Sequence, residues 1–183
     1  GVPITAEVCP HHISLTDEGL KTFDTNFKVN PPLRTPADID EIIAGIADGT
    51  ITILASDHAP HAPYEKEVEL DRAPFGMLGL ETELPVFLEI LLHQRKAVTL
   101  PRIIEMLTIN PANLLRLDRG TLSTGAVADI TIIDPDHAWT YDKNDSPSLS
   151  RNSPFHGFPL RGRALTTIVG GKLVWDLENG FRN

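Results

Sequence analysis

The order of hydrophobic and polar positions in the first half of the chain predicts a strand, a loop, a helix and a second strand. Residues 4–8 form a strand-like segment, and residues 50–55 are a nearly continuous apolar run, typical of a parallel strand covered on both faces. Between them, the isoleucines of residues 39–46 repeat at the spacing of one helix face. Thr35 is placed to cap this helix and Gly49 to end it.

The connections around these elements are predicted to be long loops. The first begins at Cys9 and ends near Arg34, where two consecutive prolines favour extended backbone. The second runs from residue 56 to about Gly79. Two amphipathic helices then follow, marked by the apolar positions of residues 84–91 and 100–107. A short helical turn is expected to begin at Asn110 and Pro111.

The pattern changes near Gly120, where strands replace helices. Residues 128–134 and 166–175 are predicted strands, and the second is folded at Gly170–Gly171 into a two-residue hairpin turn. The polar stretch 142–159 between them is predicted to be an irregular loop. We therefore divide the chain into residues 1–119 and 120–183. The second part is too small and too rich in strand edges to fold alone, so we expect it to complete a sheet with residues outside this chain.

Polar side chains follow each predicted strand of the first part, which favours a βα-barrel. In such barrels chemistry collects on the loops after the strands, and the glycine-rich phosphate loop of a doubly wound sheet is absent from the sequence. The segment Ser56–His61 comes directly after the second strand. In that place Asp57 can ligate a divalent metal and accept a proton from an attacking water. His61 can donate a hydrogen bond to a substrate carboxylate. The alternative, that Asp57 only caps a turn and the histidines are surface residues, stays open on these residues alone.

Composition narrows the classes of partner. The formal net charge of −9 disfavours nucleic acid and anionic membranes, and no apolar run reaches the length of a membrane span. The single cysteine, Cys9, excludes an internal disulfide and favours a reducing compartment, so we expect a cytoplasmic protein. A packing role is expected for Cys9.

Three separated blocks resemble class I dihydroorotases, in the same order along the chain. They are KVNPPLR at 28–34, DHAPH at 57–61 and APFGMLGLET at 73–82. EVCPHHISLT at 7–16 adds support, and GTLSTGAVADITIIDPD at 120–136 is similar to the closing β-segment of the amidohydrolase superfamily. The resemblance implies an α/β fold in which residues 1–119 are the C-terminal part of a (β/α)8 TIM-type barrel. Residues 120–183 would be the C-terminal part of a small β-sandwich domain.

The resemblance also implies an activity and a site. The reaction is the reversible cyclisation of N-carbamoyl-L-aspartate to L-dihydroorotate in pyrimidine synthesis. Asp57 matches the metal ligand and catalytic carboxylate at the end of the eighth strand, while Asn30 and His61 match substrate-binding groups. Phe75 and Gly76 match a loop whose backbone contacts the dihydroorotate ring. A buried Asn30 would offer an amide to that ring, and Gly76 would allow close backbone approach.

The remaining histidines are predicted to be structural or surface residues. We expect His11 and His12 to be structural residues of the first loop and not principal metal ligands, because a metal site needs several converging ligands. His93, His137 and His156 are expected at the surface. One or two zinc ions are implied, with most ligands upstream of Gly1, so the chain alone should be inactive and should expose faces that favour association.

Several alternatives stay open. Gly1–Pro3 lead directly into a strand-like segment, which favours a fragment of a longer protein. The parent could be another cyclic amidohydrolase, such as a hydantoinase or allantoinase, although His61 and the Phe75–Gly76 loop favour a carboxylate-bearing ring. It could also be a noncatalytic homologue that assembles with aspartate transcarbamoylase, or the chain could be an independent binding domain. A homodimer is a further arrangement to test.

Overall fold

Two short parallel strands lie at the centre of the first part of the molecule. In this computed structural model, which describes residues 2 and 4–182, β1 (Glu7–Val8) pairs with β2 (Ile53–Leu54). Two further backbone bonds, from Thr52 N–H to the Ala6 carbonyl and from Ala55 N–H to the Val8 carbonyl, prolong the ladder. The predicted parallel strands are therefore confirmed, but their regular part is shorter than the apolar runs.

The segment after β1 contains helical turns where a long loop was predicted. It holds a helical turn, α1 (Pro10–Ser14), and two 3-10 turns, η1 (Asp17–Thr22) and η2 (Thr25–Phe27). Pro10 occupies the first helical position, where a missing N–H costs nothing. The prediction of a continuous loop from Cys9 to Arg34 is therefore wrong at Pro10–Ser14, where a helical turn forms.

Helix α2 (Pro36–Asp48) forms as predicted. The Thr35 side chain accepts from the Asp38 N–H while the Asp38 carboxylate accepts from the Thr35 N–H, which satisfies two free donors of the first turn. Gly49 ends the helix in the left-handed region, at φ 86°. Local chemistry therefore fixes both ends of this helix.

The remaining helices follow β2. After the short α3 (Pro63–Lys66), α4 (Leu80–Phe87) passes without interruption into a π-helical turn, η3 (Leu88–Gln94). The predicted helices at 100–107 and near Asn110 are present as α5 (Leu100–Leu107) and α6 (Ile109–Leu114). None of the helices in the described residues is long and apolar enough to cross a membrane.

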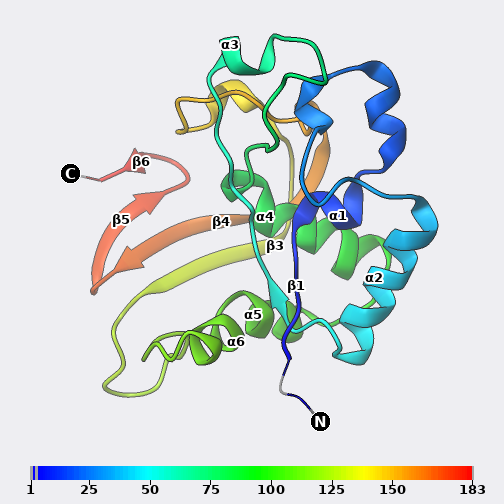
Figure 1. Cartoon of the computed structure of the whole chain (residues 1–183). Helices are drawn as coiled ribbons and strands as arrows, with labels where there is room; N and C mark the ends of the chain where they lie inside the picture. Colours follow the sequence, from blue (N-terminus) through cyan, green and yellow to red (C-terminus); the bar gives the residue numbers. More distant parts are fainter. Residues whose placement is uncertain (1, 3, 183) are drawn as a thin grey trace.

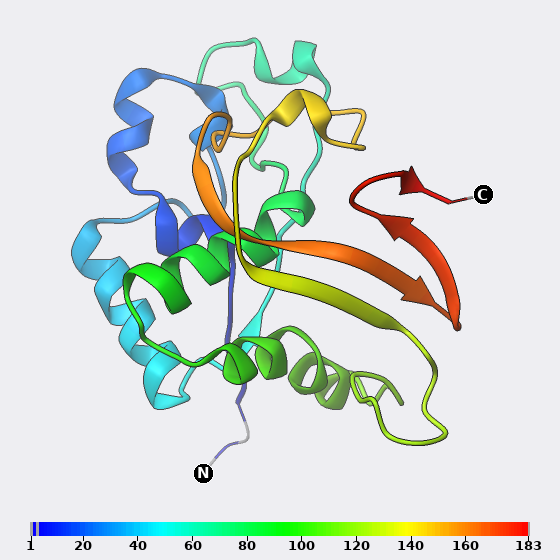
Figure 2. The ribbon, with the colours of Figure 1, turned by 180° about the vertical axis from the view of Figure 1, so that it is seen from behind.

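The last part of the chain is an antiparallel sheet in the order β3–β4–β5–β6 (Figure 2). Its strands are β3 (Ile130–Thr140), β4 (Pro159–Val169), β5 (Lys172–Asp176) and β6 (Gly180–Phe181). Gly170 and Gly171, both at positive φ, make the predicted hairpin turn between β4 and β5. Strands β3 and β4 extend beyond their predicted bounds, and the long connection between them carries one 3-10 turn, η4 (Lys143–Asp145).

Two apolar clusters hold these parts together. The first joins the two central strands to α1, α2, α4, η3 and α5. The second includes Leu15 and Val86 from the first part and Tyr141, Phe155 and Leu160 from the second. Residues on both sides of the predicted boundary at 119/120 therefore share one cluster, and the boundary itself stays a prediction.

The loops after β1 and β2 and the β3–β4 connection gather at one end of the molecule, whereas α5 and α6 lie toward the other (Figure 1). Parallel strands place their carboxyl ends at one edge, so this gathering follows from the pairing of β1 with β2. The candidate site residues lie in these loops.

Candidate functional site

Asp57 stands three residues beyond β2 with an unusual backbone. Its φ is 48°, in the left-handed region that non-glycine residues seldom occupy. Such conformations persist where the surrounding structure holds them, and they concentrate at functional sites. Its side chain is 43% exposed, and Oδ2 lies 3.7 Å from Nε2 of His11.

His11 is buried beside Asp57. The residue is 1% exposed, and Nε2 has no hydrogen-bond partner among the described residues. Burial, and secondarily His12, lowers the pKa of His11 to about 3, so the imidazole is neutral at physiological pH. A neutral imidazole binds a cation through Nε2 only in the tautomer that carries its proton on Nδ1.

Two neighbours of His11 complete a cluster of metal-ligating atom types. The ligating atoms of Cys9, His11 and His12 lie within 4.8 Å of one another. His12 Nε2, however, is 2.9 Å from the Pro31 carbonyl, so that nitrogen carries the proton and donates. Burial, with Asp57 and two glutamates adding to it, raises the pKa of Cys9 to about 12, which keeps the thiol protonated. His11 is therefore the member of the cluster best prepared to bind a cation.

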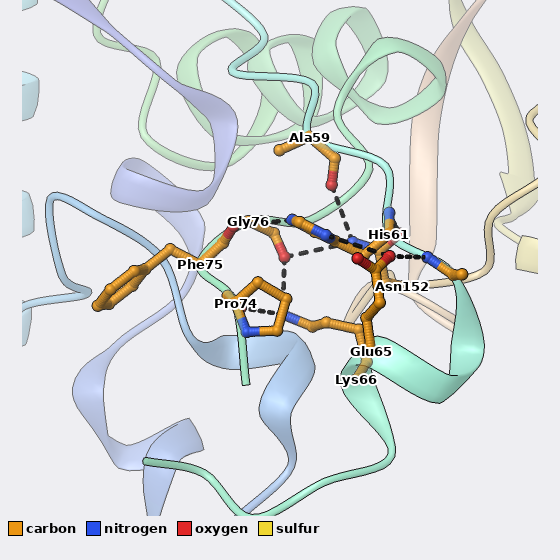
Figure 3. Close-up of polar contacts among 9 residues, drawn as sticks. Ala59, His61, Glu65, Lys66, Pro74, Phe75, Gly76 and Asn152 are labelled. Carbon is orange, nitrogen blue, oxygen red and sulfur yellow. Dashed lines mark hydrogen bonds and ion pairs between the residues drawn. The ribbon is translucent and has the colours of Figure 1, made fainter. Parts of the chain in front are cut away.

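A second group brings together His61, Phe75 and Gly76 (Figure 3). His61 Nε2 is 3.0 Å from the Phe75 carbonyl and donates to it, and its Nδ1 is 3.6 Å from Oε2 of Glu65. The Gly76 N–H donates to the Lys28 carbonyl at 2.9 Å. Three of the sequence-predicted substrate residues thus occupy one small region, and their backbone groups already bond within the protein.

Gly76 is required by both space and conformation. Its φ is 126°, and a Cβ atom there would lie 2.5 Å from Cβ of Ala59 and 3.3 Å from His61 Nε2. The group that comes close to Gly76 in this structure is the 59–61 segment. Approach by a ligand stays a prediction.

Asn30 differs from its prediction, because it is exposed where a buried amide was expected. It lies beside the Val29 backbone in the segment that ends at Pro31, and that segment contacts His12 through the Pro31 carbonyl. Lys28 places its ammonium 4.8 Å from the centre of the Phe75 ring. The 28–31 segment therefore borders both groups, with the Asn30 amide at the surface.

His58 has a role that the sequence did not reveal. Its Nδ1 accepts from the N–H groups of Gly79 and Leu80, at 3.1 and 3.2 Å, which caps the first turn of α4 from a distant segment. His93 is also not the surface residue expected, since its partly buried Nε2 lies 2.8 Å from the Pro135 carbonyl. His156 is exposed as predicted. The roles of His58 and His93 depend on partners far away in the sequence, which local sequence patterns do not reveal.

The amidohydrolase family model matches residues 7–174. The chain belongs to the amidohydrolase family. It is 48% identical over 176 residues to a protein named dihydroorotase from a Geobacter species, a match that covers 96% of this chain and 41% of that protein. A dihydroorotase from Solibacter usitatus is 47% identical over 179 residues, again across 41% of its length. The chain thus spans about two fifths of these curated relatives.

A solved hydantoinase structure contains the fold of this chain. The L-hydantoinase (dihydropyrimidinase) from Arthrobacter aurescens superimposes with a TM-score of 0.88 at 30% sequence identity. The superposition covers 97% of this chain and 40% of the hydantoinase. The mixed α/β arrangement described above is therefore that of an amidohydrolase.

Amidohydrolases are generally metal-dependent, and the observed residues fit such a group. A buried imidazole nitrogen without a hydrogen bond is costly unless something binds it, and His11 Nε2 faces a carboxylate oxygen. Three other buried side-chain atoms of the described residues also lack a hydrogen-bond partner, so the expectation that His11 is a structural residue stays a prediction. The available sequence signal was the position of His11 just after a buried strand, the same signal that singled out Asp57.

Proposed function

We propose that the polypeptide carrying this sequence is a dihydroorotase that interconverts N-carbamoyl-L-aspartate and L-dihydroorotate. The observation that carries the proposal is the His11–Asp57 pair, held within an amidohydrolase fold at the strand ends. Relatives that are 46–49% identical across nearly the whole chain are named dihydroorotases, which supports this substrate. The expected location is the cytoplasm.

The fold proposal follows the same relatives. Residues 1–119 would form the last strands and helices of a (β/α)8 barrel, with β1 and β2 as adjacent strands of that barrel. Residues 120–183 would form the C-terminal part of a small β-sandwich domain. The parallel pairing of β1 with β2 and the antiparallel β3–β6 sheet are consistent with both assignments.

His11 and Asp57 would hold zinc. A bound zinc ion supplies Lewis-acid polarisation of the ring amide carbonyl. Two side chains do not complete a tetrahedral protein site, so further ligands must come from residues other than this pair. For that reason the 183-residue chain, tested alone, should bind zinc weakly and be inactive.

Ring opening adds one water across the amide bond of dihydroorotate. Asp57 accepts a proton as the water oxygen attacks the carbonyl carbon, and the same proton can pass to the ring nitrogen when the carbon–nitrogen bond breaks. His61 would bind the substrate carboxylate, while Asn30 and the Phe75–Gly76 backbone would contact the ring. His61 donates through Nε2 to Phe75 here, so a contact from Nδ1 to a carboxylate requires the protonated ring.

A hydantoinase is the second candidate, favoured by the structural match to the Arthrobacter enzyme. Its 30% identity is lower than the 48% shared with the Geobacter dihydroorotase, which favours the first candidate. A noncatalytic partner of aspartate transcarbamoylase is the third. Retention of both Asp57 and an unpaired His11 argues against it, because a noncatalytic homologue has no need of a cation site. Formation of a homodimer would be compatible with each of these three candidate functions.

The test begins with the natural polypeptide that carries this sequence, whose intact mass, zinc content and turnover of dihydroorotate and hydantoin are measured together. Asp57→Ala and His11→Ala should each abolish ring opening, and both should lower bound zinc. Asp118→Ala, at an exposed aspartate, is the matched control and should retain activity. Turnover of hydantoin alone would favour the second candidate, and a zinc-free, inactive wild type would favour the third.

A further inference from the structure

A buried lysine lies beneath the Phe75–Gly76 segment. Lys66, the last residue of α3, is 6% exposed, and its ammonium donates to the carbonyls of Pro74 and Gly76, both at 2.9 Å (Figure 3). Its own carbonyl accepts from the Thr25 hydroxyl, which ties the end of α3 to the first loop region. The Lys66 backbone is thus bonded to Thr25, while the Lys66 side chain is bonded to the Pro74–Gly76 segment.

The acceptors of this ammonium are neutral. Burial lowers the pKa of Lys66 to about 8, with Asp24 acting against the shift and Lys28 adding to it. Lysine is rarely buried without a carboxylate partner, since removing the charge from water is costly. Two carbonyls directed at the ammonium are what compensates that cost here. The lysine and the loop backbone therefore constrain each other.

Asn152 reaches the same loop from the other side. It comes from the β3–β4 connection, is buried, and donates from Nδ2 to the carbonyls of Ala59 and Gly76 at 2.9 and 3.2 Å. Its Oδ1 accepts from the His61 N–H at 3.1 Å, and its carbonyl accepts from the Leu78 N–H. One side chain thus joins the 59–61 segment to the 76–78 segment.

These bonds fix the orientation of the peptide units near His61. The Gly76 carbonyl accepts hydrogen bonds from Lys66 and Asn152, and together these bonds fix the orientation of its peptide plane. The Phe75 carbonyl precedes it by one residue and receives His61 Nε2. The peptide units of these two carbonyls meet at the Gly76 Cα atom, so the two donors restrain the segment that carries the acceptor of His61. The imidazole orientation thereby depends on the two donors beneath the loop.

We propose that Lys66 and Asn152 are positioning residues that hold the Pro74–Gly76 backbone and His61 in the arrangement that binds substrate. This inference rests on the proposed function, which makes His61 and the Phe75–Gly76 backbone contacts of the substrate. Their side chains bond backbone groups of the two segments and not Asp57, so their loss should weaken substrate binding more than it slows the chemical step.

The test compares Lys66→Met, which keeps the apolar stem and removes the donors, with Lys66→Arg, which keeps donors and charge. In the natural full-length polypeptide, Lys66→Met should raise KM for dihydroorotate about tenfold or more and change kcat by less than about threefold. Lys66→Arg should restore part of the loss. Lys172→Met, at an exposed lysine of β5, is the control and should match wild type.

A second readout does not depend on substrate. Amide hydrogen exchange of residues 73–79 should accelerate about fivefold or more in Lys66→Met and in Asn152→Ala, with α2 and α5 unchanged. If exchange and KM both stay at wild-type values in both variants, or if kcat alone falls, the inference is wrong. Should Lys66→Met fail to fold, Asn152→Ala decides the question by the same two measurements.

The two proposals fail in different ways. A wild-type polypeptide without dihydroorotate turnover would overturn the proposed function, while the exchange experiment would still show whether Lys66 and Asn152 hold the loop. Faster exchange with an unchanged KM in an active enzyme would overturn the positioning role alone. A fall in melting temperature with unchanged KM would show a merely structural lysine.

Discussion

At the scale of single residues, the candidate site depends on groups that local rules disfavour. Asp57 has a positive φ, His11 Nε2 is buried without a partner, and Lys66 is a buried cation. Each departs from the usual preference of its residue type, and each lies in the segment that follows β1 or the segment that follows β2. Departures of this kind concentrate where function imposes a second requirement.

Replacing Gly76 separates crowding from backbone strain. Gly76→Ala combines a positive φ with a Cβ pressed against Ala59, whereas Gly157→Ala has a positive φ in open space. We expect Gly157→Ala to lower the free energy of unfolding by about 1 kcal/mol and Gly76→Ala by about 3 kcal/mol. Urea denaturation of both variants measures the difference. Equal losses of stability in the two variants would mean that the 59–61 segment moves aside for the added Cβ atom at no measurable cost in free energy.

Glu83 should make stability depend on pH. Burial raises the pKa of this carboxyl to about 7, above the value of 4.5 expected in the unfolded chain. The folded state then holds the proton more tightly, so stability is complete below pH 4.5 and falls as pH rises toward 7. Glu83→Gln should be more stable than wild type at pH 8 by about 1–3 kcal/mol, and the advantage should vanish near pH 4.5. Thermal unfolding across this range is the measurement.

The control for that titration is Glu41→Gln, at an exposed glutamate of α2. It should leave the pH dependence of the melting temperature as in wild type. A stability gain in Glu83→Gln that is the same at pH 4.5 and pH 8 would assign the effect to packing instead of charge.

At the scale of elements, the sequence predicts what adjacent residues decide. Thr35, Asp38 and Gly49 lie next to the ends they cap, so α2 could be placed closely from sequence. The hairpin at Gly170–Gly171 follows the same logic. The α1 turn was missed because Pro10 is compatible with either a loop or a helix start, and packing beside β1 decides between them.

The site was predictable only in part, for a related reason. Asp57, His61, Phe75 and Gly76 were chosen by position and resemblance, and the structure groups the last three. The contact of His11 with Asp57 joins residues 46 positions apart, and its recognition requires the parallel pairing of β1 with β2. The sequence around Lys66 carries no signal of its burial, because that burial depends on carbonyls eight and ten residues away.

An ion pair connects the π-helical turn η3 to β4. Arg161 donates from Nε and Nη2 to the two carboxylate oxygens of Glu89, each at 2.9 Å, and Gln94 adds a third bond. Glu89 is buried while Arg161 is partly exposed. Arg161→Met should therefore lower the free energy of unfolding by about 1–3 kcal/mol, since a buried carboxylate loses its main partner.

The double variant is the decisive comparison for that pair. Glu89→Gln combined with Arg161→Met removes the uncompensated charge, so it should lose less stability than Arg161→Met alone in urea denaturation at pH 7. The Arg161 hydrogen bond holds the pKa of Glu89 below its usual value, and its contribution should therefore decline as pH falls. Additive losses would contradict a coupled pair.

At the scale of the whole molecule, net charge and exposed apolar surface have opposite effects on association between copies of the chain. The net charge of −9 favours separation of copies, while large apolar side chains are exposed along the second part of the chain. Examples include Leu122, Leu149, Val169 and Phe181.

The 183-residue chain, purified alone, should therefore associate, and more strongly as salt screens its charge. Light scattering coupled to gel filtration should give a mass above the monomer's 20.1 kDa, rising when NaCl increases from about 0.05 to 0.5 M. The paired substitution Leu149→Ser with Phe181→Ser should reduce the effect. A monomer at every salt concentration would show that these side chains do not mediate association.

The bond from Asn152 to Ala59 also orders events during protein synthesis. These residues are 93 positions apart, and at about 5–20 residues per second the ribosome needs roughly 5 to 20 seconds to pass from one to the other. During that interval the nascent Ala59–Gly76 segment lacks the amide that joins its two ends. The segment of residues 59–76 therefore matures only after Asn152 has been made, and a translational pause before the Asn152 codon would prolong its susceptibility to proteases.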